Sequence, residues 1–256
     1  MNTSKTIIAI GGGENGRPGY PYETLEIDKR IVELSNKENP KLLFIGTASS
    51  DSEGYFECIR KNFGNLGCEV LNLAITKNDY TYEELQNAIL GVDIIYVGGG
   101  NTMKMLDLWR ENQIDKLLMQ AYNQGIVLSG LSAGSLCWFK YCNSDSLRFE
   151  ENTDKLILLE GLGFINAVHC PHYDAEENRK DSLKEMMKDI PDLVAIALEN
   201  CVAIEFIDDE YRIIKSKETS KAYKTYWENN EYVELELEET LDYKPLNELV
   251  SKNEVL

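Results

Sequence analysis

The chain of 256 residues is poor in basic residues and has no long apolar segment. Its 26 Lys and Arg side chains stand against 44 Asp and Glu side chains, which gives a formal net charge of −18. Because nucleic acids and anionic membrane surfaces are bound by basic faces, this charge argues against both as partners. No apolar run approaches the roughly 18–20 residues of a membrane-spanning helix. The first residues lack the apolar core of a secretory signal, so we expect a cytoplasmic location.

Cysteine and histidine are also sparse, which limits the metal and redox sites that the chain could form. The six cysteines contain no C-x-x-C pair, and most lie in apolar segments, so we expect reduced, buried thiols. The two histidines lie close together, as His169 and His172. An H-x-x-H pair without further obvious ligands is a weak metal site, because catalytic zinc needs three protein ligands. We expect neither a metal nor another cofactor.

Apolar runs alternate with helix-period segments over the first half of the chain. This alternation predicts right-handed βαβ units, and therefore an α/β fold with a mainly parallel sheet flanked by helices on both faces. The expected strands are Thr6–Ile10, Lys41–Ile45, Val70–Leu73, Val92–Val97 and Ile126–Leu128. The expected helices are Glu23–Ser35, Gly54–Asn65, Thr81–Ile89 and Thr102–Tyr122.

The second half of the chain differs in character. A charged amphipathic helix is expected at Ala175–Asp189, and the segments around it favour an antiparallel β extension. No linker rich in Pro, Gly or Ser divides the chain, so residues 1–256 are expected to form a single domain. Its expected parts are a parallel core over about 5–145, a β-rich extension over about 146–230 and an acidic C-terminal tail over 231–256. The later expected strands are Leu193–Leu198, Val202–Ile207, Tyr211–Lys215 and Ala222–Trp227.

The most informative motif is Gly130-Leu131-Ser132-Ala133-Gly134, which lies between an expected strand and an expected helix turn. A G-x-S-x-G in this position is the pattern of a nucleophile elbow. The flanking glycines are needed because side chains there would collide with the neighbouring strand and helix. Ser132 would take up a strained geometry at a helix N-terminus, where backbone N–H groups favour developing negative charge. The alternative is a small-residue turn that only packs the helix against the sheet.

A serine nucleophile needs a base that takes its proton and returns it to the leaving group. Histidine suits this role because its pKa lies near neutral. Residues three apart in an extended segment point to opposite faces, so one histidine alone can readily face the elbow. We prefer His172, which follows Pro171 at the end of the expected strand, over His169 within it. No histidine follows residue 172, which disfavours the Ser…Asp…His order of α/β-hydrolases.

The base in turn needs a carboxylate that orients its imidazole. Glu199 is the first choice because it ends an apolar strand, where an acid is unexpected. Glu205 and Asp174 are the alternatives.

Glycine-rich segments follow several of the expected strands on one side of the sheet. Gly98-Gly99-Gly100 offers N–H groups that, with that of Ala133, could form an oxyanion hole. The segment from Gly11 to Gly16 does not fit a dinucleotide-binding fingerprint, because no helix follows its last glycine, and the chain has no phosphate-binding P-loop sequence. The glycines therefore favour acyl transfer over nucleotide binding.

These motifs together resemble the dipeptidase E and cyanophycinase family of serine peptidases. The shared features are a first strand ending in GGG, T-A-S after the second strand, GGGNT after the fourth and G-x-S-A-G-S after the fifth. The resemblance covers about residues 5–230. It implies a fold like a class I glutamine amidotransferase domain, with a flavodoxin-like core and serine in place of the cysteine nucleophile.

The resemblance also implies roles for individual residues. Ser132 would be the nucleophile, His172 the base, and the acid would lie on a later strand near Glu199. The implied oxyanion donors are Ala133 and either Gly99 or Gly100.

The resemblance implies a small peptide as the partner, because family members cleave after aspartyl residues, in Asp-X dipeptides or in cyanophycin. Selecting an aspartyl carboxylate requires a nearby cation, for which Arg179 and Arg148 are the candidates. Asn101 and Thr102 of the GGGNT segment are candidate substrate contacts. Two alternatives stay open: an amidase or esterase of the same fold acting on another small acyl compound, and a catalytically silent binding homologue. The apolar positions of the β-rich half could bury a homodimer interface or complete the monomer's own core.

Overall fold

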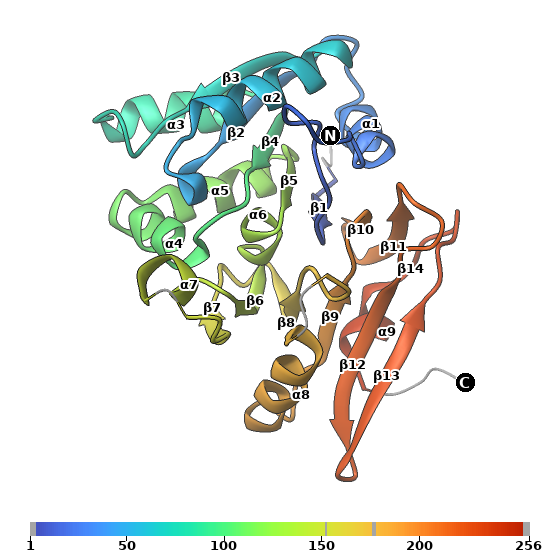
Figure 1. Ribbon diagram of the computed structural model, residues 1–256. Coiled ribbons are helices and arrows are strands. Elements are labelled where there is room, and N and C mark those ends of the chain that lie inside the picture. Colours follow the sequence, from blue (N-terminus) through green and yellow to red (C-terminus); the bar gives the residue numbers. More distant parts are fainter. Residues whose placement is uncertain (1–3, 152, 176–177, 253–256) are drawn as a thin grey trace.

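The computed structural model describes residues 4–151, 153–175 and 178–252. Eight strands of this part form a mixed sheet in the order β14-β11-β10-β1-β5-β4-β2-β3 (Figure 1). The strands from β1 to β3 in this order run parallel, and β10 pairs antiparallel with β1. The strands are β1 (Thr6–Ile10), β2 (Lys41–Ile45), β3 (Glu69–Leu73), β4 (Ile94–Val97), β5 (Val127–Leu131), β10 (Val202–Ile207), β11 (Glu210–Lys215) and β14 (Lys244–Pro245). The predicted parallel α/β core is confirmed.

Helices cover both faces of this sheet because its central strands β1, β4 and β5 are buried on both faces. In β1, Ile8 and Ile10 pack with side chains of α1 and α2, while Ile7 and Ala9 pack with those of α3, α4 and α5. The helices are α1 (Leu25–Leu34), α2 (Glu53–Asn65), α3 (Tyr82–Leu90), α4 (Thr102–Glu111) and α5 (Ile114–Asn123). The single helix expected over Thr102–Tyr122 is two helices, because Gln113 adopts a left-handed φ of 58° between them. No described helix is long and apolar enough to cross a membrane.

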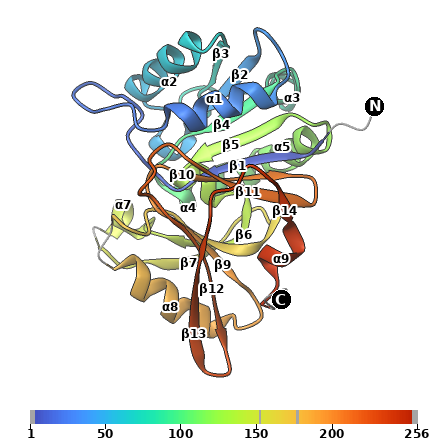
Figure 2. The ribbon, with the colours of Figure 1, turned by 90° about the vertical axis from the view of Figure 1, so that its right-hand side faces the viewer.

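A second sheet of six described strands lies beside the first, in the order β13-β12-β9-β8-β6-β7 (Figure 2). Its strands β6, β8 and β9 run parallel to one another. The β extension that was expected to be antiparallel is therefore partly parallel. The strands are β6 (Phe139–Ser144), β7 (Ile157–Glu160), β8 (Ile165–Cys170), β9 (Ala195–Leu198), β12 (Ala222–Glu228) and β13 (Glu231–Leu237). The remaining helices of the described chain are the 3₁₀ helix η1 (Thr47–Ser49), α6 (Ala133–Leu136), α7 (Leu147–Glu151), α8 (Arg179–Asp189) and α9 (Leu246–Val250).

The expected acidic tail begins with a strand. Residues 231–237 form β13, which pairs with β12 along its whole length. Val233, Leu235 and Leu237 are half-buried, while Glu234 and Glu236 between them are exposed. This alternation is the period-two pattern of a strand with one covered face. The pattern was not recognised in the sequence because the segment is rich in glutamate.

The two sheets share one hydrophobic core. Phe139 of β6 and Phe206 of β10 meet edge to face, with their ring centroids 6.0 Å apart. Ile196 and Leu198 of β9 belong to the same cluster as Ile7 and Ala9 of β1. The first passage of the chain from the first sheet to the second runs through α6, and the first return runs through residues 199–201 between β9 and β10. These two crossings position the candidate site.

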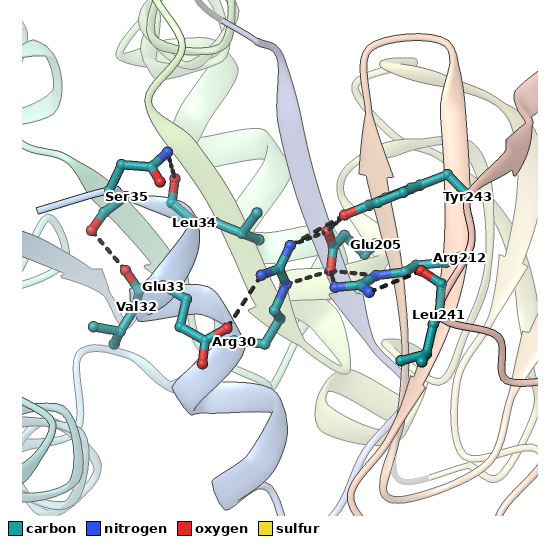
Figure 3. A network of polar contacts seen from close by, with 10 residues as sticks. Arg30, Val32, Glu33, Leu34, Ser35, Glu205, Arg212, Leu241 and Tyr243 are labelled. Atoms are coloured by element: carbon teal, nitrogen blue, oxygen red, sulfur yellow. Dashed lines mark hydrogen bonds and ion pairs between the residues drawn. The ribbon is translucent and has the colours of Figure 1, made fainter.

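A buried ion network holds α1 against the antiparallel strands of the first sheet (Figure 3). Glu205 is 0% exposed, and Arg30 donates to its two oxygens from Nε and Nη2 at 2.9 Å each. Arg212 donates to Glu205 Oε2 at 3.1 and 3.2 Å, and the Tyr243 hydroxyl donates to Oε1. Burial alone would raise the pKa of Glu205, but these hydrogen bonds and guanidinium charges hold it below its usual value. Glu205 is therefore a structural residue here, not the partner of His172.

Candidate active site

Ser132 lies at the turn between β5 and α6 in a conformation that few residues adopt. Its φ of 57° and ψ of −114° lie outside the ordinary regions for a side chain with a Cβ. Its N–H donates to the Ile10 carbonyl at 3.1 Å, and its own carbonyl accepts from the N–H groups of Ser135 and Leu136 at 2.8 and 2.9 Å. Such strained residues persist where the surrounding hydrogen bonds determine them, and they cluster at functional sites.

The flanking glycines are required by close contacts, as the sequence predicted. A Cβ on Gly130 would lie 2.3 Å from the carbonyl oxygen of Gly134. A Cβ on Gly134 would lie 2.1 Å from the carbonyl oxygen of Val97 in β4. Both distances are far below van der Waals contact, so no larger residue fits the turn. The elbow is therefore built to hold Ser132 close against the end of the sheet.

His172 follows β8 and lies directly against this serine. Its Nε2 is 2.9 Å from Ser132 Oγ, and its Nδ1 is 2.8 Å from Asn200 Oδ1. Because an amide oxygen only accepts, Nδ1 carries the hydrogen, and Nε2 presents its lone pair to the serine hydroxyl. The His172 N–H donates to the Gly11 carbonyl at 3.0 Å, which helps to fix its left-handed φ of 52°. The imidazole is thus held in the tautomer that can accept the serine proton.

Asn200, rather than the expected Glu199, orients the imidazole. Glu199 accepts from the Lys221 N–H at 2.8 Å and from the Tyr223 hydroxyl at 3.4 Å. Neighbouring residues at the end of a strand point in opposite directions, so only one of the two can face His172. The prediction of Glu199 was wrong by one position.

Asp174, the other alternative, supports Asn200 from behind. Its Oδ1 accepts the Asn200 N–H at 2.9 Å, so it contacts the main chain of this residue. The arrangement Ser132–His172–Asn200 has an uncharged third member, as in the Cys-His-Asn sites of papain-like proteases.

Gly12, in the first glycine run, lies against the side chains of His172 and Asn200. A Cβ on Gly12 would lie 2.0 Å from Asn200 Oδ1 and 2.4 Å from His172 Nδ1. The Gly12 carbonyl also accepts the Cys201 N–H at 2.9 Å. Gly12 was missed as a functional residue, although the glycine run at the end of the first strand marked a place of close approach.

An open pocket of about 530 Å³ adjoins the serine. It is lined by Ser132 and His172, by Tyr55 and Gly99, and by Arg17 and Glu14 from the loop after β1. This volume is in the range of small-molecule sites. The further lining residues are Gly13, Asn15, Pro18, Ser49, Ser52, Gly54, Cys58 and Leu131.

The residues of the GGGNT segment lie at different distances from the nucleophile. Gly99 is close enough to the nucleophile that a Cβ on it would lie 3.3 Å from Ser132 Cβ, and its N–H donates to the Tyr55 hydroxyl at 3.2 Å. Gly100 packs on η1, since a Cβ there would lie 2.2 Å from the Ala48 carbonyl oxygen. Asn101 and Thr102 are buried, and Asn101 Oδ1 caps α4 by accepting from the Lys104 N–H at 3.1 Å. These last two residues shape the loop and do not line the pocket.

The two arginines expected to bind substrate lie elsewhere. Arg179 is 1% exposed and donates to the Asn143 carbonyl and side chain at 2.7 and 3.0 Å. Arg148 is exposed on α7 and is not part of the pocket lining. Among the described residues that line the pocket, Arg17 carries the positive charge. Its Nε and Nη2 each donate to Glu14 at 2.8 Å, and its guanidinium lies 3.9 Å from the centre of the Tyr20 ring.

The second histidine forms a buried pair of its own. His169 Nε2 is 2.9 Å from Ser135 Oγ, and its Nδ1 is 2.9 Å from the Ile196 carbonyl. The side chain is 0% exposed within β8, as expected for the strand position. Burial lowers the pKa of His169 to about 3, so the ring is neutral at physiological pH. This pair lies outside the pocket lining and serves the packing of α6 on the second sheet.

Comparison with known proteins identifies the family. The model of peptidase family S51 matches residues 7–214. The chain belongs to peptidase family S51. This S51 chain is therefore a peptidase of the serine type, and the resemblance to the dipeptidase E family is confirmed.

Two curated relatives of this S51 peptidase match over most of their length. A protein named uncharacterized peptidase YgaJ, from Bacillus subtilis (strain 168), is 34% identical over 236 residues, which cover 91% of this chain and 97% of that protein. Peptidase E of Nostoc sp. is 25% identical over 240 residues, which cover 90% and 93% of the two chains.

Solved structures show the same fold. A peptidase from an acI-B1 Actinobacterium matches with a TM-score of 0.70 at 18% identity, covering 95% of this chain and 98% of that one. A peptidase E protein from Listeria monocytogenes EGD-e, described as putative, matches with a TM-score of 0.61 at 19% identity, covering 83% and 99%. At these identities the likeness establishes the arrangement of helices and strands.

Proposed function

We propose that this S51 peptidase hydrolyses short peptides with an aspartyl residue at the N-terminus, through an acyl-enzyme formed on Ser132. The contact that supports the proposal most is the one between Ser132 Oγ and His172 Nε2, at 2.9 Å, on the wall of the pocket. A base within hydrogen-bond reach of a serine, itself oriented by a third group, is the arrangement that nucleophilic catalysis needs.

The reaction would begin with attack of Ser132 Oγ on the scissile carbonyl carbon, while His172 Nε2 takes the hydroxyl proton. The carbonyl oxygen becomes an oxyanion beside the N–H of Ala133, the residue after the nucleophile. His172 then gives the proton to the departing amine, and the C–N bond breaks. A water molecule, deprotonated by the same imidazole, releases the acyl group and restores the serine.

Asn200 would hold the imidazole by its Nδ1–H throughout these steps. Because an amide carries no net charge, it stabilises the transient imidazolium less than a carboxylate would. Asn200 therefore contributes mainly orientation and tautomer choice.

Glu14 and Arg17 supply the two charges that an N-terminal aspartyl residue would require. The Glu14 carboxylate could accept from the free ammonium group. Arg17 donates to Glu14 from Nε and Nη2. Among the described residues no acceptor is found for its Nη1, so this nitrogen could donate to the aspartyl carboxylate. An analogue that lacks either charge would lose its ionic contact with Glu14 or with Arg17 and should be a poorer substrate.

The test is hydrolysis of Asp-Leu, Asn-Leu and N-acetyl-Asp-Leu by wild type, Ser132→Ala and Arg17→Gln. We expect wild type to prefer Asp-Leu over both analogues, and Ser132→Ala to lose at least about 10³-fold in kcat/KM. Arg17→Gln should lose most of the preference for Asp-Leu over Asn-Leu, while Arg148→Gln, exposed on α7, keeps it.

Two outcomes would contradict parts of the proposal. Equal inactivity of wild type and Ser132→Ala on every peptide would reject the serine mechanism. Turnover of small amides or esters but not of aspartyl peptides would reject the substrate class and favour an amidase or esterase.

A further inference from the structure

Tyr55 of α2 lines the same pocket as the nucleophile, and packing fixes the position of its ring. The ring centroid lies 5.2 Å from that of Phe44 in β2, with the two rings tilted by 60°. A Cβ on Gly98 would lie 2.9 Å from Tyr55 Cε1, so the absence of a side chain at position 98 makes room for the ring. The phenol is therefore placed by packing on two sides.

The hydroxyl of Tyr55 is engaged as an acceptor and still has its hydrogen to give. Gly99 N–H donates to it at 3.2 Å, which uses one lone pair of the oxygen. Within the described residues, no group is found that accepts the Tyr55 hydrogen. Burial raises the pKa of Tyr55 to about 12, although the bond from Gly99 lowers it, so the phenol keeps its proton at neutral pH.

The sequence predicted that the Gly99 N–H would donate to the oxyanion. In the structure it donates to the Tyr55 hydroxyl oxygen instead. Gly99 lies against the nucleophile, since a Cβ on it would be 3.3 Å from Ser132 Cβ. The hydrogen-bond donor that can reach the substrate at this position is therefore the Tyr55 hydroxyl, not the Gly99 N–H. A donor that itself accepts a hydrogen bond is polarised and becomes a stronger donor.

We propose that Tyr55 is a catalytic residue whose O–H donates to the oxyanion, with Gly99 N–H behind it and Ala133 N–H as the second donor. This inference rests on the proposed serine mechanism. No proton leaves Tyr55: the hydrogen bond forms as charge develops on the carbonyl oxygen and weakens when the carbonyl is restored. The assignment replaces direct donation by Gly99.

The test is Tyr55→Phe, which keeps the ring and removes only the hydroxyl. Tyr96→Phe is the matched control, because Tyr96 is fully buried on β4, lies 6.5 Å from the same Phe44 ring and has an unpartnered hydroxyl in the described structure. The readouts are kcat and KM on the preferred dipeptide, the rate of labelling by a fluorophosphonate probe, and the thermal unfolding temperature.

We expect Tyr55→Phe to lower kcat by about 10²-fold, in the range of a lost oxyanion donor, with KM changed less than about twofold. Labelling should slow in parallel, because the phosphonyl oxygen enters the same hole. Tyr96→Phe should match wild type in kcat, KM and labelling, and its unfolding temperature should be equal or higher, because the buried hydroxyl that it loses has no partner in the described structure.

The inference is overturned if Tyr55→Phe keeps or exceeds wild-type kcat while wild type is active, or if KM and unfolding temperature change instead of kcat. Either result leaves the serine mechanism standing. Ser132→Ala is expected neither to hydrolyse peptides nor to be labelled by the probe. If wild type behaves in the same way, the proposed function fails and this inference fails with it.

Discussion

The chain contains two serine–histidine pairs of the same length, and only one of them faces the pocket. Ser132 and His172 are 2.9 Å apart, and so are Ser135 and His169. In both pairs an oxygen acceptor holds Nδ1, from Asn200 in the first and from the Ile196 main chain in the second. Distance and tautomer therefore do not distinguish a reactive pair from a structural one.

The environment of the two imidazoles makes the difference. His169 is completely buried and its pKa is lowered to about 3, so accepting a proton from Ser135 would place a charge in apolar surroundings. His172 lines the pocket beside a serine of strained backbone. A general base must become a cation for part of each cycle, and the comparison indicates that this requirement separates the two sites.

The largest expected effect comes from replacing each histidine in turn. His172→Gln should lower kcat/KM by at least about 10³-fold, because the base is lost while the pocket stays. His169→Gln should change kcat/KM by less than about 10-fold, since its ring touches no reacting atom. Steady-state hydrolysis of the preferred dipeptide measures both, with circular dichroism to verify folding. Equal losses in the two variants would contradict the distinction between the pairs.

A smaller effect is expected from the neighbours Asn200 and Glu199. Asn200→Asp should move the acidic limb of the pH profile of kcat/KM to higher pH by about one unit, because a carboxylate stabilises the imidazolium. Glu199→Gln is the matched control and should leave the profile in place, since its side chain contacts Lys221 and Tyr223. A shift in Glu199→Gln but not in Asn200→Asp would show that the roles are reversed.

No change in activity is expected from the third effect, which concerns stability and belongs to the buried pair alone. Unfolding returns His169 to its ordinary pKa near 6.5, so below that pH the unfolded chain binds a proton that the folded chain refuses. Stability from this group is present above about pH 6.5 and is lost as pH falls toward 3. Between about pH 7.5 and pH 5, wild type should lose about 2 kcal/mol more than His169→Gln.

Urea unfolding of both proteins at the two pH values measures this difference. Comparing the variants cancels the contributions of other titrating groups. An identical pH dependence in both proteins would mean that His169 is not kept neutral by burial.

The elbow and the parallel core were predictable because each depends on local sequence. The glycines at 130 and 134 are dictated by contacts that any elbow of this kind makes, and the strands of the core are short apolar runs. The partner of His172 was not predictable to the residue, because a shift of one position at a strand end reverses the direction of the side chain. The acidic character of Glu199 attracted the assignment, while the amide beside it makes the contact.

Arg17 and Tyr55 were beyond sequence reasoning for a different reason. Their positions beside Ser132 depend on how the loop after β1 and the helix α2 fold over the end of the sheet. Arg179, by contrast, looked accessible in a charged helix, and it is buried against Asn143 and Asp145. Burial of a charged residue follows from tertiary packing, which periodicity alone does not reveal.

The crossing of the chain between the two sheets has a consequence for how activity would be lost. The nucleophile is carried out of the first sheet by β5, while its base extends from β8 of the second. The 2.9 Å distance between Ser132 Oγ and His172 Nε2 therefore depends on how the two sheets pack against each other. A displacement of about 1 Å between the sheets would part the serine from its base while every helix and strand remained formed. On heating, turnover should therefore fail at a lower temperature than the secondary structure does.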